Sequence, residues 1–183
     1  MKIHLCAGDC FLTNYINCDI DGKIVELCDR NKMALRALSN YYKDRMVGNK
    51  HTTRVDLKFN VLRFPWPWEN GSVDELVMIQ AIEHFTLQEA GFIVSEVKRV
   101  LKTGGKFLVD FPDIETTVKQ YINHNPNFCM RFIYCNHKNK YSIHHWGYTR
   151  ETFAELLGDG WQLNFRNIVE HDYPVIGCEA IKL

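Results

Sequence analysis

Short apolar runs alternate with longer amphipathic segments along most of this chain. Strands are predicted where apolar residues alternate or cluster between turn signals, which occurs at 2–6, 15–18, 53–59, 76–79, 106–111, 161–168 and 175–183. Helices are predicted where apolar residues recur every three or four positions, which occurs at 29–46, 87–101, 114–122 and 149–157. Alternation of strands and helices is typical of a sheet covered by helices, so the pattern predicts an α/β fold.

Two connections refine this prediction. Too few residues separate the strands at 2–6 and 15–18 for a crossover helix, so a loop or single turn is expected between them. The short link between 161–168 and 175–183 favours antiparallel pairing of these two strands. The expected fold is therefore a doubly wound, mostly parallel Rossmann-like sheet with an antiparallel C-terminal strand.

The size of the chain suits one domain. Its 183 residues, of which 46% are hydrophobic, are enough for one buried core but not for a second. We therefore expect residues 1–183 to form a single domain. The segment 123–148 is polar, aromatic and irregular in pattern, and is expected to be a lid or substrate loop.

Charge and cysteine content exclude several classes of function. Lys plus Arg equals Asp plus Glu at 22 each, so no net field attracts nucleic acid or an anionic membrane. Lys138, Lys140 and Arg150 are too few to form a basic face for nucleic acid. No apolar run is long enough to cross a bilayer or to act as a signal peptide. Seven cysteines in a chain that is neither short nor cysteine-rich indicate free thiols in a reducing cytoplasm.

The loops at the ends of the predicted parallel strands carry the candidate chemistry. Ligands of doubly wound sheets lie outside the carboxyl ends of the strands. Four such loops contain Cys6-Ala7-Gly8, Asp19-Ile20, Asn60-Val61 and Gln80-Ala81, and Asp113 follows the next strand. We therefore expect these residues to share one rim of the domain.

Several segments resemble class I S-adenosylmethionine-dependent methyltransferases, in particular the small type 11 group. Residues 80–85 (QAIEHF) are similar to the H-V-L-E-H-F segment of that family, and residues 15–19 (YINCD) to its W-x-N-V-D segment. Residues 101–106 (LKTGGK) follow the helix at the place where the family has a similar glycine turn. The resemblance spans 3–168 and leaves 22–52 as an expected insertion. It implies methyl transfer with S-adenosylmethionine as the cofactor.

The resemblance also implies the cofactor contacts. The backbone at Cys6, Ala7 and Gly8 would approach the methionine part of the cofactor, although Cys6 and Ala7 stand where the family has glycine and a small residue. Asp19, followed by Ile20, would accept hydrogen bonds from both ribose hydroxyls. Asp29 is the alternative ribose ligand if the register uses residues 24–29.

Adenine would be bound at the next two loops. Asn60 would accept a hydrogen bond from the adenine amino group, with Asp56 as a second choice, and the backbone of Val61 would contact the ring. Three residues of the fourth loop would line the same pocket, namely Gln80, Ala81 and His84.

Catalysis of transfer to a hydroxyl or a protonated amine requires removal of a proton. His144 and His145 are the candidate bases, since residues 144–148 (HHWGY) are similar to a family segment, and Asp113 would assist them. A zinc site that combines these histidines with Cys129, Cys135 and His137 is not expected, because the segment lacks a C-x-x-C pair. No metal is therefore predicted.

The methyl acceptor is expected to be a small molecule, a saccharide or another compact compound. The departures from the family pattern at Cys6, Ala7, Asn60 and Gln80 leave a second function open, a protein that binds the cofactor without transferring its methyl group. The sequence does not determine the oligomeric state.

Overall fold

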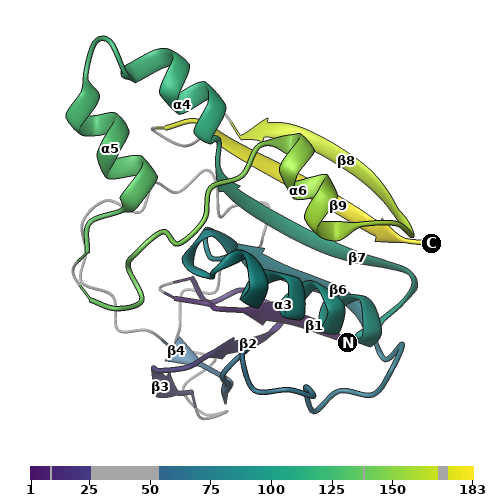
Figure 1. The fold of residues 1–183 in the computed structure, drawn as a ribbon. Coiled ribbons are helices and arrows are strands. Elements are labelled where there is room, and N and C mark those ends of the chain that lie inside the picture. The colour runs from purple at the N-terminus through teal and green to yellow at the C-terminus, as the bar shows by residue number, and fades with distance from the viewer. Residues whose placement is uncertain (9, 26–53, 138, 169–172) are drawn as a thin grey trace.

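A seven-stranded sheet organises the computed structural model, which describes residues 1–8, 10–25, 54–137, 139–168 and 173–183 (Figure 1). Its strands, in spatial order, are β5 (Leu57–Lys58), β2 (Ile16–Asp19), β1 (Lys2–Leu5), β6 (Val73–Ile79), β7 (Leu101–Pro112), β9 (Val175–Lys182) and β8 (Trp161–Ile168). The first five strands run parallel, and β9 runs antiparallel to both of its neighbours. The predicted fold class is confirmed. Two short strands, β3 (Lys23–Ile24) and β4 (Arg54–Val55), form a separate parallel pair.

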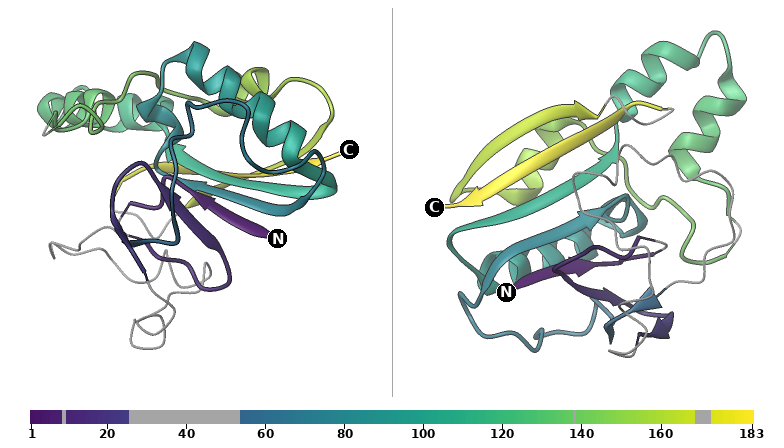
Figure 2. Two further views of the ribbon diagram at one scale, coloured as in Figure 1. Left: turned by 90° about the horizontal axis from the view of Figure 1, so that it is seen from below. Right: turned by 180° about the vertical axis from the view of Figure 1, so that it is seen from behind.

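The helices form where an apolar stripe meets an N-terminal cap. Helix α3 (Leu87–Val100) buries Ala90, Ile93, Val94, Val97 and Val100. Its Thr86 and Glu89 form a capping box, which satisfies free N–H groups at the first turn. Helix α6 (Arg150–Leu157) begins with a similar box from Thr149, in which Thr152 takes the position that Glu89 has in α3. Figure 2 shows α3 and α6 on the same side of the sheet.

Three local predictions were wrong in part. The segment 123–148 is not irregular throughout, because helix α5 (Pro126–Tyr134) follows α4 (Ile114–Tyr121). Asn125 caps α5 by accepting a hydrogen bond from the backbone of Phe128. Pro126 follows it, and the fixed φ of proline suits the first position of a helix. The role of this segment as a lid stays a prediction.

The pattern predicts Gly104-Gly105 as the exit of the helix at 87–101, but these glycines do not end the helix directly. Helix α3 ends at Val100, β7 begins at Leu101, and the pairing of β6 with β7 shifts register between Val73 and Glu75. Gly105 lies in this irregular stretch, where an added Cβ would come within 2.8 Å of the carbonyl oxygen of Lys102. A side chain there would force the backbone to move.

The strand predicted at 53–59 is broken at Asp56. The Asp56 carboxylate accepts hydrogen bonds from the backbone N–H and the side-chain amide of Asn17, at 2.8 and 3.0 Å. The chain therefore joins the small β3–β4 pair before this residue and the main sheet after it. The helix predicted at 29–46 and most of the expected insertion at 22–52 lie outside the described residues.

A short connection joins β1 to β2, as predicted, and it covers the second face of the sheet. Among its described residues there is no helix. Its side chains Cys10, Leu12 and Tyr15 pack instead against Val77 and Ile79, which point away from α3. The sheet thus has an apolar cover on both faces near β6.

Asn17 holds this connection in place. Its amide oxygen accepts hydrogen bonds from the backbone of Leu12 and from His4 Nδ1, at 2.8 and 3.0 Å, and its amide nitrogen donates to the carbonyl oxygens of Leu12 and Tyr15. His4 is almost fully buried, and burial lowers its pKa to about 4. The folded chain therefore keeps this imidazole neutral.

His4 should make the stability of the fold sensitive to mild acid. Because the pKa of His4 is lower in the folded chain, the stabilisation is complete above its ordinary value of 6.5 and is lost as the pH falls toward 4. Between pH 7 and pH 5 this loss amounts to about 2 kcal/mol of unfolding free energy. In His4→Asn, which keeps a donor for Asn17, the difference between urea unfolding at the two pH values should shrink by about this amount.

The matched control is His124→Asn, which changes an exposed histidine beyond α4. This variant should keep the parental pH dependence. A parental difference between the two pH values in His4→Asn would show that His4 does not cause the acid sensitivity.

Candidate functional site

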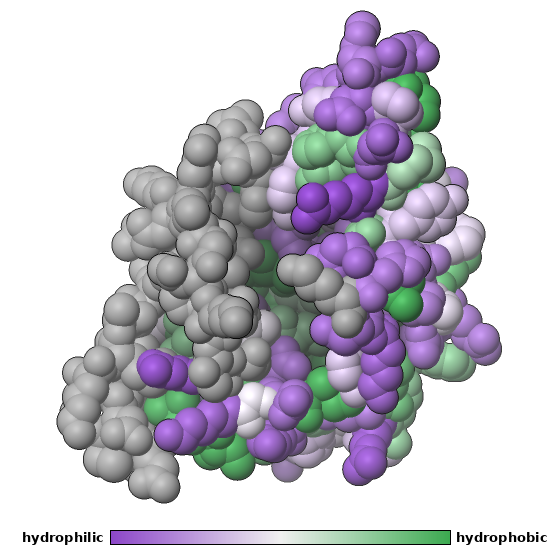
Figure 3. All heavy atoms as spheres, turned by 90° about the vertical axis from the view of Figure 1, so that its left-hand side faces the viewer, coloured by the Kyte–Doolittle hydropathy of each residue, from purple (hydrophilic) through white to green (hydrophobic). Residues whose placement is uncertain are grey.

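The predicted site residues gather at one edge of the sheet. The parallel strands β5, β2, β1, β6 and β7 all end there, and each is followed by one of the predicted loops. Figure 3 shows this side of the molecule, where hydrophobic residues lie in a hollow near the centre and hydrophilic residues border it on the right and below. The topology therefore forms the rim that the sequence predicted.

The first two loops are joined by a direct hydrogen bond. The backbone N–H of Gly8 donates to Asp19 Oδ2 at 2.9 Å, and the N–H of Ala7 donates to the carbonyl oxygen of Cys18 at 3.0 Å. Cys6 and Gly8 both have left-handed backbones, with φ of 52° and 50°. This conformation is costly for Cys6 and natural for Gly8. The predicted partners Gly8 and Asp19 are thus brought together, with Ile20 exposed beside them.

The third loop forms its hydrogen bonds with residues close to it in sequence. Asn60 Oδ1 accepts a hydrogen bond from the backbone of Leu62 at 2.9 Å, which closes a local turn. Val61 is buried, and its carbonyl oxygen accepts a hydrogen bond from the Trp66 ring. Asp56, the second choice for adenine, bonds to Asn17 as described above. The adenine contacts stay predictions.

Gln80 links the fourth loop to the neighbouring strand. Its backbone N–H and side-chain amide both donate to Oδ1 of the buried Asp110, at 2.8 and 2.9 Å. Its side-chain oxygen accepts a hydrogen bond from the Tyr173 hydroxyl at 2.9 Å. Gln80 is a non-glycine residue with a φ of 46°, a conformation often found at functional sites. Ala81, which follows it, is buried.

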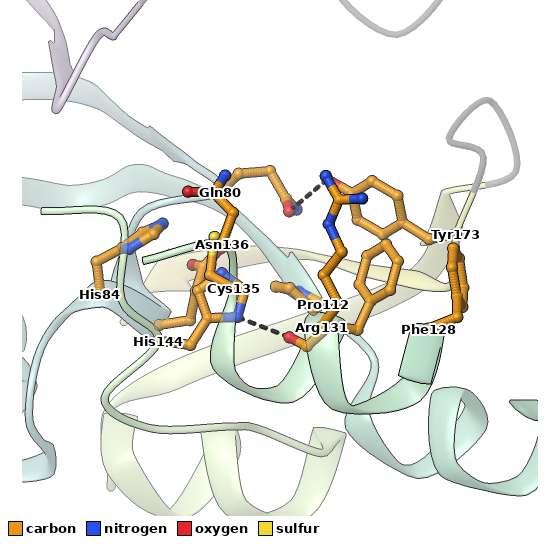
Figure 4. A pocket seen from close by; sticks show the side chains of 11 residues that line it. Gln80, His84, Pro112, Phe128, Arg131, Cys135, Asn136, His144 and Tyr173 are labelled. Atoms are coloured by element: carbon orange, nitrogen blue, oxygen red, sulfur yellow. Dashed lines mark hydrogen bonds between the residues drawn. The ribbon is translucent and has the colours of Figure 1, made fainter. Parts of the chain in front are cut away.

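A cavity of about 420 Å³ lies beside this loop. Figure 4 shows Gln80, His84, Cys135 and His144 toward one side of the cavity, and Phe128, Arg131 and Tyr173 toward the other. The short helix η1 (Ile82–His84) and α5 therefore supply opposite walls. A volume of this size suits a small organic ligand.

One end of the cavity contains Glu83, His84 and His144, and we call these three residues the polar end. Glu83 is 2% exposed, and among the described residues no hydrogen-bond donor reaches its Oε2 atom. Burial raises the pKa of the Glu83 carboxyl well above its ordinary value. A buried carboxyl oxygen without a hydrogen-bond partner is unusual and needs an explanation.

Backbone carbonyl groups orient the two histidines. His84 Nδ1 donates to the carbonyl oxygen of Ile143 at 3.0 Å, and His144 Nδ1 donates to that of Phe132 at 2.8 Å. Burial lowers the pKa of His84 to about 4 and also lowers the pKa of His144. Both rings are therefore neutral near pH 7, and each keeps a lone pair on Nε2. Their centroids lie 4.8 Å apart.

The opposite end is aromatic and cationic. Phe132 packs against Phe128 and Tyr173, with ring centroids 4.7 and 4.4 Å apart. Arg131 lies on the same helix face and is exposed, and within the described part of the chain no acceptor bonds to its guanidinium. This end can hold a ring or an apolar surface beside an acidic group.

The three predicted catalytic residues are not brought together. His144 lines the cavity, whereas His145 is exposed and does not, although its backbone N–H donates to the carbonyl oxygen of Glu83 at 2.8 Å. Asp113 caps helix α4, where its two carboxylate oxygens accept from the backbone and the hydroxyl of Thr116, at 2.9 and 2.7 Å. Its carboxylate thus has a structural task.

Sequence reasoning missed Arg131, Tyr173 and the burial of Glu83. A signal for Arg131 was present in the sequence, because Phe128, Arg131 and Phe132 have helical spacing and lie on one face of α5. Tyr173 follows residues outside the described part and has no comparable local pattern.

No helix among the described residues is long and apolar enough to cross a membrane.

Comparison with known proteins agrees with this geometry. Residues 4–109 match the family model of a methyltransferase domain. In fold, the chain is similar to a chain from the complex between the Haloferax volcanii Trm112 methyltransferase activator and a methyltransferase, at 12% identity and a TM-score of 0.59, over 99% of this chain and 81% of that one. No curated protein matches the sequence.

Two further solved structures have the same fold. A Methanosarcina mazei S-adenosylmethionine-dependent methyltransferase is 15% identical, with a TM-score of 0.56 over 98% of this chain and 90% of that one. The magnesium protoporphyrin IX methyltransferase of Synechocystis, solved with bound S-adenosylhomocysteine, is 11% identical, with a TM-score of 0.55 over 100% of this chain and 74% of that one.

The family match covers more than half of the chain and includes four of the five loops at the rim. The mostly parallel sheet with its antiparallel strand β9 is the fold of the matched structures. The chain therefore belongs to the methyltransferase domain family, as a class I enzyme whose cofactor is S-adenosylmethionine.

Proposed function

We propose that this enzyme transfers a methyl group from S-adenosylmethionine to a small-molecule or saccharide acceptor bound in the cavity between η1 and α5. The observation that carries the proposal is the position of Gln80. This residue belongs to the rim at the end of β6 and also lines the cavity. A cofactor at the rim and an acceptor in the cavity would therefore meet beside it.

The cofactor would lie along the rim in the order of the strands. Backbone groups at Cys6, Ala7 and Gly8 would contact its methionine part, Asp19 and Ile20 its ribose, and Asn60 and Val61 its adenine. Gln80, Ala81 and His84 would line the pocket near the methyl group. The hydrogen bond between Gly8 and Asp19 supports this arrangement, because it holds the first two loops at a fixed distance.

The acceptor would be recognised by the aromatic and cationic end. The rings of Phe128, Phe132 and Tyr173 can pack against a sugar or another compact ring. Arg131 can donate two parallel hydrogen bonds to a carboxylate or phosphate. An acceptor that combines a hydroxylated ring with an acidic group fits both features.

Methyl transfer is an in-line displacement in which the acceptor oxygen attacks the methyl carbon and the carbon–sulfur bond breaks. The protein's main task is to align these three atoms and to exclude water. The proton of an acceptor hydroxyl must also leave, and His144 is the better placed of the two predicted bases because its ring lines the cavity. Asp113 would contribute indirectly, through the cap of α4.

Asp19 should be necessary for cofactor affinity. A carboxylate bound to ribose hydroxyls contributes about 1.5–3 kcal/mol. Asp19→Ala should therefore weaken binding of S-adenosylhomocysteine by roughly one to two decades in a calorimetric titration. Asp21→Ala removes an exposed carboxylate of the same loop and should leave the affinity unchanged. Parental affinity in Asp19→Ala together with a loss in Asp29→Ala would move the ribose ligand to Asp29.

His144 should affect turnover rather than cofactor affinity. The test incubates the protein with methyl-labelled S-adenosylmethionine and pools of small metabolites or saccharides, and then identifies the labelled product by mass. Removal of a general base typically costs 10²–10⁴ in rate, so His144→Ala should lower turnover by about that factor. His124→Ala is the matched control and should keep parental turnover.

Parental turnover in His144→Ala across neutral and mildly alkaline pH would exclude this histidine as the base. Cofactor binding without label transfer to any pool would contradict the proposed acceptor and favour an acceptor of another class.

A further inference from the structure

Three side chains that could each supply a metal ligand converge at the polar end of the cavity. One ligand atom each from Glu83, His84 and His144 lies within 4.8 Å of the other two. In the described part of the chain this is the only group of three such side chains with that geometry. The residues come from two segments distant in sequence, η1 and the stretch before Tyr148, so the tertiary fold assembles the group.

The hydrogen bonds of the two histidines determine which ring nitrogen is available. Carbonyl oxygens only accept hydrogen bonds, so the Nδ1 atoms bonded to Ile143 and Phe132 must carry the protons. Each Nε2 atom therefore has a free lone pair. Metal-binding histidines typically donate their other ring N–H to a backbone carbonyl or a carboxylate, which fixes the tautomer and the ring orientation.

Glu83 adds an independent observation. Its Oε2 atom is buried and has no hydrogen-bond donor among the described residues. A proton on this carboxyl could be shared with only one of the two imidazoles, so the lone pair of the other ring would receive no donor from it. A cation placed between the three side chains satisfies all of them at once.

We propose that Glu83, His84 and His144 bind a divalent metal ion, preferentially Zn²⁺, with an open coordination position toward the cavity. Two imidazoles and one carboxylate suit zinc, whereas Mg²⁺ and Ca²⁺ prefer oxygen ligands alone. Three protein ligands with a vacant fourth position are typical of catalytic rather than structural zinc sites.

The chemical role of the ion rests on the proposed function. An acceptor hydroxyl bound at the open position would lose its proton to water more readily, because the ion stabilises the resulting alkoxide. The alkoxide oxygen would then form the bond to the methyl carbon as the carbon–sulfur bond breaks, which leaves S-adenosylhomocysteine. In this arrangement His144 acts as a ligand and the ion replaces it in activating the hydroxyl.

Metal binding can be measured without an acceptor. The full chain is treated with a chelator, dialysed and titrated with Zn²⁺ by calorimetry, and Co²⁺ serves as a probe whose visible absorption reports its coordination geometry. We expect one ion per chain. Glu83→Gln and His144→Ala should each lower the affinity at least about tenfold, since even the loss of a second-shell partner costs about 10–100-fold. His124→Ala should bind like the parent.

Titration of the same variants with S-adenosylhomocysteine checks that they are folded. If Glu83→Gln does not bind the cofactor product, His144→Ala, in which a half-buried ring is removed, decides the question. Absence of a one-to-one complex in the parent, or parental affinity in a folded Glu83→Gln or His144→Ala variant, would overturn the metal site.

Failure of this proposal is distinguishable from failure of the proposed function. Methylation of a small acceptor at an unchanged rate after chelation, without bound metal, would remove the metal site and leave the acceptor cavity intact. Stoichiometric Zn²⁺ binding that depends on Glu83 and His144, without methylation of any small acceptor, would support the metal site and contradict the acceptor.

Discussion

Asp110 lies fully buried in β7, and its carboxylate fixes the turn from which the site is built. It accepts two hydrogen bonds from Gln80, and its backbone carbonyl accepts a third. Together they stabilise a left-handed backbone at Gln80, which for a non-glycine residue costs about 1–3 kcal/mol. The turn directs the chain out of the sheet into η1. Asp110 thus holds Gln80, two positions before η1, and thereby helps to place Glu83 and His84 at the cavity.

The same sheet shows how a small methyltransferase can dispense with a helix between its first two strands. The connection from β1 to β2 packs Leu12 and Tyr15 on the face opposite α3, and Asn17 satisfies the backbone groups that a helix would have bonded internally. A single buried amide thus replaces a regular element. The consequence for the site is a tight first turn, in which Gly8 reaches Asp19 directly.

The sequence predicted elements well where local pattern and burial coincide. The continuous apolar run at 76–79 is buried on both faces of the sheet and the apolar stripe of the helix at 87–100 on one face, so the local pattern alone identified β6 and α3. Helix α5 was missed because it is short and lies between polar segments, so its helical spacing was not separated from the irregular pattern around it. The break at Asp56 was missed because it depends on a contact with Asn17 from a distant strand.

The rim was predictable from topology, but the roles of its acidic residues were not. Asp113 and Glu83 both follow strands of the central sheet, and only tertiary contacts distinguish them. Thr116 satisfies the Asp113 carboxylate within one helical turn, whereas the Glu83 carboxylate enters the interior and meets two histidines that offer lone pairs. Burial of an unsatisfied acid lowers the stability of the folded chain. A proton, an ion or a ligand that binds the Glu83 carboxylate would offset part of this loss of stability. Because Glu83 belongs to η1, the stability of the η1 conformation is linked thermodynamically to the occupant of the cavity.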